Sequence, residues 1–254
     1  MVFWKTIRDE SGKALACTLI LLAAIVAAIL YYPEFKEKYR LWIQVVPKFG
    51  VPIIGDVLQL GYGGYIGFQQ YMKGVNAAGA IFAVLLGAGS VAREVETGTI
   101  QFLLAQPVSR TSVMVQKFAA LVILIAAPIF LSSLAIVPLS RAIGETIDLR
   151  PLVLCSAYLS LELCVILSYA MLFSVLFDEQ IREGGAAGGV TAVMAILLMI
   201  EKTNSLSLFS HSSLGHLKVI LSGQGFPWVD AAWFATISLA LVALSTLVFR
   251  RKDL

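Results

Sequence analysis

Long apolar runs alternate with short polar stretches along the whole chain. Six runs have the length of a membrane-spanning helix, and they cover residues 14–31, 75–92, 119–139, 152–177, 184–200 and 229–249. A helix needs roughly 20 apolar residues to cross about 30 Å of hydrocarbon, because its backbone groups must bond within the segment. The sequence therefore predicts an all-α integral membrane protein with a single transmembrane domain over residues 1–254 and six spanning helices.

Composition agrees with this class, since 59% of the 254 residues are hydrophobic and only 14% are charged. The chain lacks the repeated alternating segments of outer-membrane barrels, which excludes that fold. Cys17, Cys155 and Cys164 all fall in predicted spans, so we expect apolar packing rather than disulfides. We expect lipid around the spans and no nucleic-acid partner.

An even number of spans places both ends of the chain on one side of the membrane. Basic residues adjoin both terminal spans: Lys5, Arg8, Lys13, Arg250, Arg251 and Lys252. This pattern predicts cytoplasmic termini in the cell (inner) membrane. Basic residues also crowd the segment 33–74, but long segments cross a membrane with less regard to charge.

Two stretches outside the spans are also apolar in part. Residues 2–13 place Phe3 and Trp4 on one helical face and charges on the other, which predicts an interfacial helix before the first span; a frayed tail is the alternative. The stretch 51–71 is interrupted by Asp56 and by Gly61, Gly63, Gly64 and Gly67, so we interpret it as interfacial or re-entrant rather than as a seventh span. The role of the segment 33–74 stays open.

A polar stretch at residues 93–118 separates the second and third spans. Residues 93–106 contain one glycine and several apolar side chains, which favours an amphipathic helix. Glu94 and Glu96 would lie in its first turn, where acidic groups complement the helix dipole, and Pro107 would end it. The pattern predicts a short helix, a sharp corner and the third span, which together form a rigid lever in the cytoplasm.

The start of the third span has signals of its own. Ser109 can cap this helix, because its side-chain oxygen can accept a hydrogen bond from the first turn. Lys117 lies just before the apolar run, and we expect its long side chain to extend toward the headgroups.

The stretch 93–118 resembles the first cytoplasmic loop of the permease subunits of ABC-2 type ATP-binding-cassette transporters. In that family the pattern is E-x-E-x-G-T, a hydrophobic pair, then P-[VI]-[SP]-R and a later lysine. The matching residues are Glu94, Glu96, Gly98, Thr99, Leu103, Leu104, Pro107, Val108, Ser109, Arg110 and Lys117. The resemblance implies that this loop is a coupling helix that docks onto a separate ATP-hydrolysing subunit, and that the chain is an exporter permease.

The resemblance also implies an assembly of two permeases and two ATPases, with a homodimer as our first expectation and a heterodimer as the alternative. The chain has no G-x-x-x-x-G-K-[ST] sequence, so we expect no enzyme activity or cofactor of its own, and ATP and Mg²⁺ on the partner ATPase. The substrate is not specified by the sequence. The alternative function is an ATP-independent membrane carrier or an intramembrane scaffold.

Three further features bear on sites within the membrane domain. Glu162 lies near the middle of the span 152–177, where a charge costs about 2.5–3.5 kcal/mol, so it should face the interior. It either lines a translocation path or forms a hydrogen bond with a Ser or Thr on a neighbouring helix. His211 and His216 occur without an H-E-x-x-H motif or a nearby carboxylate pair, so we expect surface groups and no metal site.

Small residues recur at four-residue spacing in the second span, at Gly79, Ala83 and Gly87. Such a ridge lets two helix backbones approach closely, which favours helix association in lipid. We expect this ridge at the seam between two permease chains, and packing inside one chain is the alternative.

Overall fold

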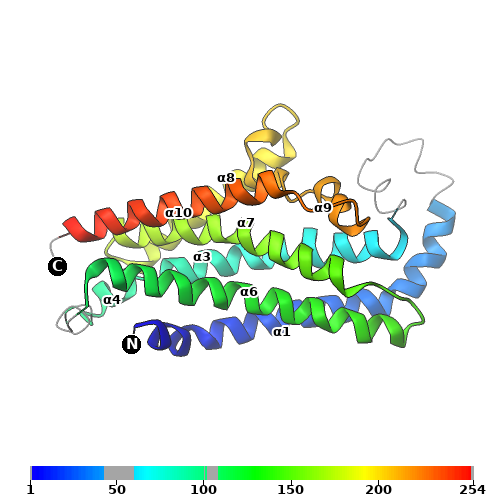
Figure 1. Cartoon of the computed structure of the whole chain (residues 1–254), viewed down its shortest axis with the longest axis horizontal. Coiled ribbons are helices and arrows are strands. Elements are labelled where there is room, and N and C mark those ends of the chain that lie inside the picture. Colours follow the sequence, from blue (N-terminus) through cyan, green and yellow to red (C-terminus); the bar gives the residue numbers. More distant parts are fainter. Residues whose placement is uncertain (1, 43–59, 100, 102–107, 253–254) are drawn as a thin grey trace.

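The computed structural model describes residues 2–42, 60–99, 101 and 108–252, and these residues form a bundle of helices without strands (Figure 1). Six helices are long and apolar enough to cross a membrane: Val2–Lys38, Leu60–Glu96, Arg110–Ala142, Leu149–Leu176, Gln180–Met199 and Trp228–Arg251. The predicted all-α fold with six candidate spans is confirmed for this part of the chain.

The elements follow one another in a simple order. The first part consists of α1 (Val2–Trp42), a helical segment at 60–66, the π-helical η2 (Gly67–Gly79), α3 (Ala80–Ala88) and α4 (Ala92–Glu96). The second part consists of α6 (Arg110–Ala142), α7 (Leu149–Leu176), α8 (Gln180–Met199), the 3₁₀ turns η3 (Asn204–Leu206) and η4 (Leu208–Ser210), α9 (Leu214–Leu221) and α10 (Trp228–Arg251).

Helix α7 forms the centre of the bundle, because α3, α6, α8 and α10 all pack against it. In its most apolar stretch 72% of the residues are buried, compared with 11% in α8, which lies at the periphery. Buried serines on α7, such as Ser156, Ser160 and Ser168, donate hydrogen bonds to carbonyls of their own helix. The hydroxyls of Ser160 and Ser168 are therefore satisfied within their own helix, whereas Ser156 also contacts Oγ of Ser133 on α6 at 2.8 Å.

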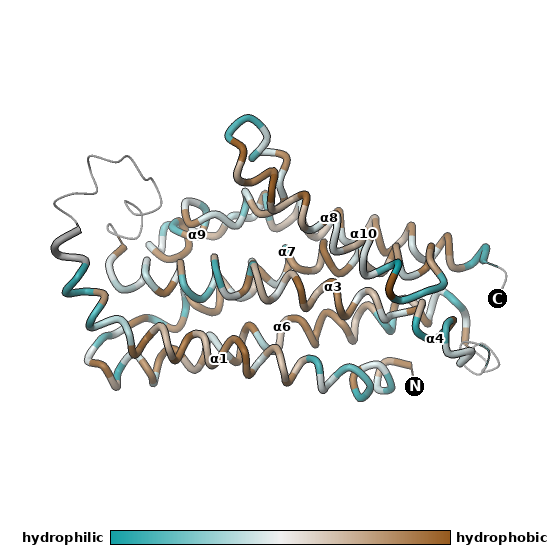
Figure 2. Tube along the Cα trace, turned by 180° about the vertical axis from the view of Figure 1, so that it is seen from behind, coloured by the Kyte–Doolittle hydropathy of each residue, from teal (hydrophilic) through white to brown (hydrophobic). Residues whose placement is uncertain are grey.

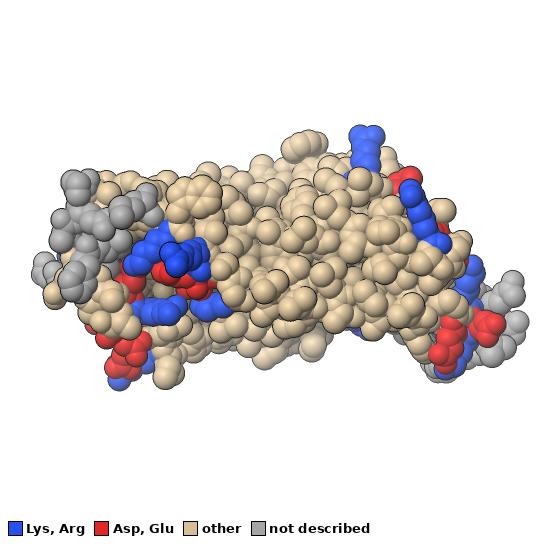
Figure 3. Space-filling view, turned by 90° about the horizontal axis from the view of Figure 1, so that it is seen from below, with Lys and Arg blue, Asp and Glu red and all other residues tan. Residues whose placement is uncertain are grey.

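Charged side chains on the surface gather mainly at the two ends of the molecule. Figure 2 shows polar residues mainly at the ends of the helices and in the turns, and Figure 3 shows an uncharged belt between two charged regions on the face drawn. Both termini and α4 lie at one end, which we call the termini end (Figure 1). At the opposite end Lys36 of α1 pairs with Glu145 at 2.7 Å. This distribution is that of a multi-pass membrane protein.

The beginning of the chain differs from the prediction. Residues 2–13 belong to the continuous helix α1 and do not form a separate interfacial helix. The backbone N–H of Phe3 donates to Oε1 of Gln116 at 3.2 Å, so the first turn of α1 is held against α6. Nor does α1 end near residue 31, because it continues through Pro33 to Trp42.

The second span is longer than predicted. It begins at Leu60, so residues 60–71 are part of this span and not a separate re-entrant segment; residues 43–59 lie outside the described part. Its polar residues face other helices: Gln70 donates to Ser132 at 2.6 Å, and the Tyr71 hydroxyl donates to the carbonyl of Leu152 at 2.9 Å. A hydropathy scale misses such a helix, because it does not distinguish polar residues that bond to neighbouring helices from those that face water. The ends of α7, α8 and α10 lie within about four residues of the predictions.

Candidate functional site

The short helix α4 is positioned by a serine of the central helix. Ser174 of α7 accepts hydrogen bonds from the backbone N–H groups of Val91 and Ala92, both at 2.9 Å, and donates to the carbonyl of Ala88 at 3.0 Å. One hydroxyl therefore satisfies groups at the end of α3 and at the start of α4, which the break between the helices would leave unpaired. The loop is thereby attached to the core of the bundle.

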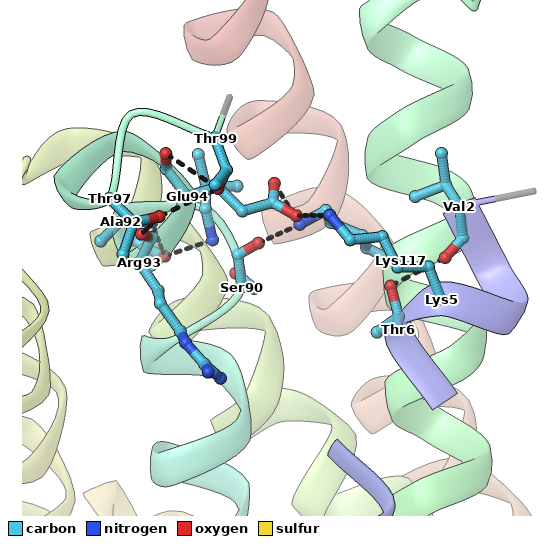
Figure 4. A network of polar contacts seen from close by, with 12 residues as sticks. Val2, Lys5, Thr6, Ser90, Ala92, Arg93, Glu94, Thr97, Thr99 and Lys117 are labelled. Carbon is cyan, nitrogen blue, oxygen red and sulfur yellow. Dashed lines mark hydrogen bonds and ion pairs between the residues drawn. The ribbon is translucent and has the colours of Figure 1, made fainter. Parts of the chain in front are cut away.

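A buried ion pair joins α4 to α6. Lys117 Nζ lies 2.7 Å from Glu94 Oε2, with only 5% of the Lys117 side chain and 14% of the Glu94 side chain exposed. Lys117 also donates to the carbonyl of Ser90, and Lys5 of α1 contacts the other carboxylate oxygen of Glu94 at 3.2 Å. Figure 4 shows these side chains converging between α4, α6 and the first turns of α1. The charges of Lys117 and Glu94 compensate each other, and either one would be costly to bury without the other.

A second ionic group links α1 to the same loop. Glu10, which is buried, pairs with Lys13 at 2.6 Å and with Arg93 at 3.4 Å. Lys13 in turn donates to the carbonyl of Leu85 at 3.2 Å, near the end of α3. A cavity of about 330 Å³ lies between the two ionic groups and is lined by both of them. We call Glu10, Lys13 and Arg93, together with Ser90, Glu94, Lys117 and Lys5, the junction.

The remaining helix ends at the termini end are joined by hydrogen bonds. Glu96 accepts a bond from the backbone N–H of Gln180, the first residue of α8, at 3.2 Å. Arg110 donates to the carbonyls of Phe249 and Lys252, where a cation complements the C-terminal end of α10. The structure therefore links α4, directly or through one neighbour, to every candidate span at this end.

The comparison with known families settles the class of this arrangement. A family model described as ABC-2 family transporter protein matches residues 2–254. The chain belongs to this family. It is thus a membrane-spanning permease component of an ABC transporter and not a nucleotide-binding domain. A search of curated proteins finds no match.

The predicted docking residues of the permease differ in their surroundings. Glu94 points into the junction, and Glu96 and Arg110 bond to α8 and α10, whereas Gly98 and Thr99 are exposed. Leu103, Leu104 and Pro107 lie outside the described residues.

The predicted helix at 93–106 is confirmed for residues 93–96 and wrong for residues 97–99. The helix α4 ends at Glu96, and residues 97–99 form a turn in which Gly98 has φ +68°, a left-handed value that glycine adopts without strain. The predicted cap is confirmed, since Ser109 Oγ accepts from the N–H of Ser112 at 3.1 Å. Lys117 does not extend toward headgroups, because Glu94 offers it a partner inside the permease.

Glu162 faces the interior of the permease, as predicted. It is fully buried and accepts a hydrogen bond at 2.9 Å from Ser212, a residue just before α9. Ser212 also accepts from Asn76 of η2 at 2.9 Å, and both lie in the wall of a largely apolar cavity of about 710 Å³. The hydrogen-bond alternative is thus observed, although the partner comes from a loop segment, and the bond adjoins this cavity.

The small-residue ridge of the second span packs inside the permease. A Cβ atom at Gly79 would lie 2.7 Å from Leu163 of α7, and one at Gly87 would meet Ala170 and lie 3.0 Å from the carbonyl oxygen of Leu167. Ala83 between them is fully buried. The expected seam at Gly79, Ala83 and Gly87 therefore needs correction, because α7 of the same chain already occupies this ridge.

The two histidines have an acidic neighbour that the sequence did not indicate. Nδ1 of His211 lies 3.2 Å from Oδ1 of Asp230 in the first turn of α10. Asp230 is 19 positions away in the chain, so no local motif connects it to His211. Only the return of the chain from α9 to α10 brings the two together.

Proposed function

We propose that this permease is an exporter subunit that docks a separate ABC ATPase at the termini end through residues 93–118. The observation that carries the proposal is the buried pair of Glu94 and Lys117, which couples this loop to the start of a spanning helix. Breaking a buried ion pair is costly, so this contact holds the loop firmly against α6. The pair makes the loop and α6 move together.

The other contacts of α4 support the same role. Lys5 and Glu10 tie it to α1, Ser174 ties it to α7, and Glu96 ties it to α8. Displacement of α4 by a bound ATPase would therefore shift the ends of several spans at once. The turn at 97–99 and Gln101 are exposed, so this part of the loop is accessible to a partner.

We propose the cavity beside Glu162 as part of the translocation path. Its wall is mostly apolar, with the Asn76 and Ser212 side chains as polar points. Such a wall suits a substrate with a large apolar portion and one hydrogen-bonding group.

The proposed complex contains two permeases, which are identical in the simplest case, and two ATPases that hold ATP and Mg²⁺. A pair of ATPases that sandwiches nucleotide needs two docking loops, and each permease supplies one. In the proposed orientation the chain lies in the inner membrane with both termini in the cytoplasm. A soluble cytoplasmic ATPase can then reach the termini end.

Copurification tests the docking proposal. We expect the variant Leu103→Asp/Leu104→Asp to insert in the membrane but to lose an untagged ATPase subunit that the wild-type chain retains. The matched control is Leu149→Asp/Leu206→Asp, which changes two exposed leucines outside residues 93–118 and should retain the ATPase. Retention by both variants would overturn the docking site, and absence of any ATPase from the wild type would favour an ATP-independent carrier or scaffold.

A further inference from the structure

Three side chains with metal-ligating atoms meet beside the first turn of α10. One ligand atom each from His211, His216 and Asp230 lies within 4.8 Å of the others. His211 follows η4, His216 lies in α9, and Asp230 lies in α10. The three groups therefore connect the segment that leads into α9 with a spanning helix.

The surroundings hold these groups in place. The Tyr158 hydroxyl of α7 donates to the carbonyl of His211 at 2.8 Å, and the ring of Trp233 lies 5.3 Å from the His211 ring, centroid to centroid. Ser213 Oγ contacts Nδ1 of His216 at 3.0 Å, which leaves Nε2 of that ring unused by this contact. Aromatic packing around His211 restricts its rotamers before any ligand binds.

We propose that His211, His216 and Asp230 bind one divalent transition-metal ion, with Zn²⁺ as the first choice. Two imidazoles and one carboxylate form a donor set that Zn²⁺ favours, whereas Mg²⁺ and Ca²⁺ select oxygen ligands. Ligand atoms about 2.1 Å from one ion lie within about 4 Å of each other. Binding would therefore draw the three ligand atoms slightly closer together than the observed 4.8 Å, and a water molecule would complete a four-coordinate site.

Metal binding has a structural consequence for the neighbouring cavity. Ser212 lies directly after His211, and its hydroxyl contacts both Glu162 and Asn76. An ion that joins His211 and His216 to Asp230 fixes the residues on both sides of Ser212 against α10. The bound ion therefore holds in place the segment that covers Glu162.

Metal titration of the purified full-length chain, with any histidine tag removed, tests the proposal without transport or ATPase activity. We expect one Co²⁺ per chain with the visible absorption of a four-coordinate site, and Zn²⁺ should displace it. His211→Ala, His216→Ala and Asp230→Asn should each weaken Zn²⁺ binding by at least about tenfold, because the loss of even an outer-shell partner of a ligand typically costs about 10–100-fold. The control Asp148→Asn changes an exposed carboxylate before α7 and should bind Zn²⁺ as the wild type does.

Thermal unfolding and hydrogen exchange give a second readout that distinguishes lost binding from lost folding. Zn²⁺ should raise the unfolding temperature of the wild type and of Asp148→Asn but not that of His216→Ala, whose metal-free unfolding should match the wild type. Zn²⁺ should also slow amide exchange in residues 207–216 of the wild type. Absence of saturable binding, or Zn²⁺ affinity unchanged in all three ligand variants, would overturn the site.

Discussion

Lys117 is almost fully buried, and an unpaired ammonium group is costly to bury. Glu94 neutralises it, and the carbonyl of Ser90 accepts a hydrogen bond from its ammonium group. The geometry makes the two charges interdependent, since removing either leaves the other in a site with little water. Stability and coupling should therefore respond together to changes at this pair.

Replacing Lys117 with Met is expected to lower the free energy of unfolding by about 3 kcal/mol, the lower end of the range for a broken buried pair, because Lys5 still contacts Glu94. Adding Glu94→Gln should recover much of this loss, since no buried charge then lacks a partner. Denaturation of the detergent-solubilised variants measures both effects as a double-mutant cycle.

The exposed lysine provides the control for this cycle. The Lys5 side chain is 47% exposed, so its ion pair with Glu94 is weak. Lys5→Met should therefore lower the free energy of unfolding by at most about 1 kcal/mol. Equal losses for Lys5→Met and Lys117→Met would contradict the view that Lys117 is the internal partner.

The bond from Ser212 to Glu162 makes a similar prediction in the middle of the bundle. Ser212→Ala should destabilise the protein by about 1–3 kcal/mol, because a buried carboxylate loses its hydrogen-bond donor. Ser160→Ala is the matched control. Ser160 is buried like Ser212, but it lies on α7 and bonds only to its own helix, so its loss of stability should be smaller. Thermal unfolding of the two variants side by side decides the point, and equal stability would argue against the Glu162 contact.

At the scale of elements, the approach of α3 to α7 depends on Gly87. A methyl group there would press on Ala170 and the Leu167 carbonyl, so Gly87→Ala should cost about 1–3 kcal/mol through overpacking. Gly188 in α8 has no atom within 4 Å of an added Cβ, and Gly188→Ala should stabilise its helix by up to about 1 kcal/mol. Unfolding measurements that give both substitutions the same sign would contradict the packing of α3 on α7.

The apolar runs predicted the number and order of the spanning helices because lipid requires a minimum length of apolar helix. They failed where polar residues face a neighbouring helix rather than water. Gln70 and Tyr71 lie in the second span and bond to α6 and α7, so the run appears interrupted although the helix continues. The length of α1 was underestimated at both ends for a related reason. The residues there are charged and interrupt the apolar run, but they are still helical.

The candidate site was predictable only where the interaction is local. Ser109 caps α6 through a residue three positions away, and the sequence shows this directly. Lys117 and Glu94 are separated by a loop, and His211 and Asp230 by the whole of α9, so their pairing depends on tertiary packing. The chemistry of each residue was visible in the sequence, but its partner was not.

At the scale of the whole molecule, the two charged ends separated by an uncharged belt require one end on each side of the membrane (Figure 3). With cytoplasmic termini, cysteines placed at Lys38 and Glu145 should react with an impermeant reagent added to intact cells. Cysteines at Glu96 and Asp178 should react only after the cells are opened. The three native cysteines are buried and should give little background.

The reverse labelling pattern would place the termini end outside the cell. In that orientation no cytoplasmic ATPase could reach residues 93–118, and the proposed coupling would be excluded.

The central claim is that an ATPase binds the loop that the junction connects to the spanning helices. Photo-crosslinking in the native membrane tests it most directly, with a photoreactive residue placed at the exposed Gln101 or, as a control, at Glu145 of the opposite end. We predict that the probe at Gln101 crosslinks to a soluble ATPase subunit and that the probe at Glu145 does not. A crosslink from Glu145 alone, or none from Gln101 in cells that produce the ATPase, would contradict the account.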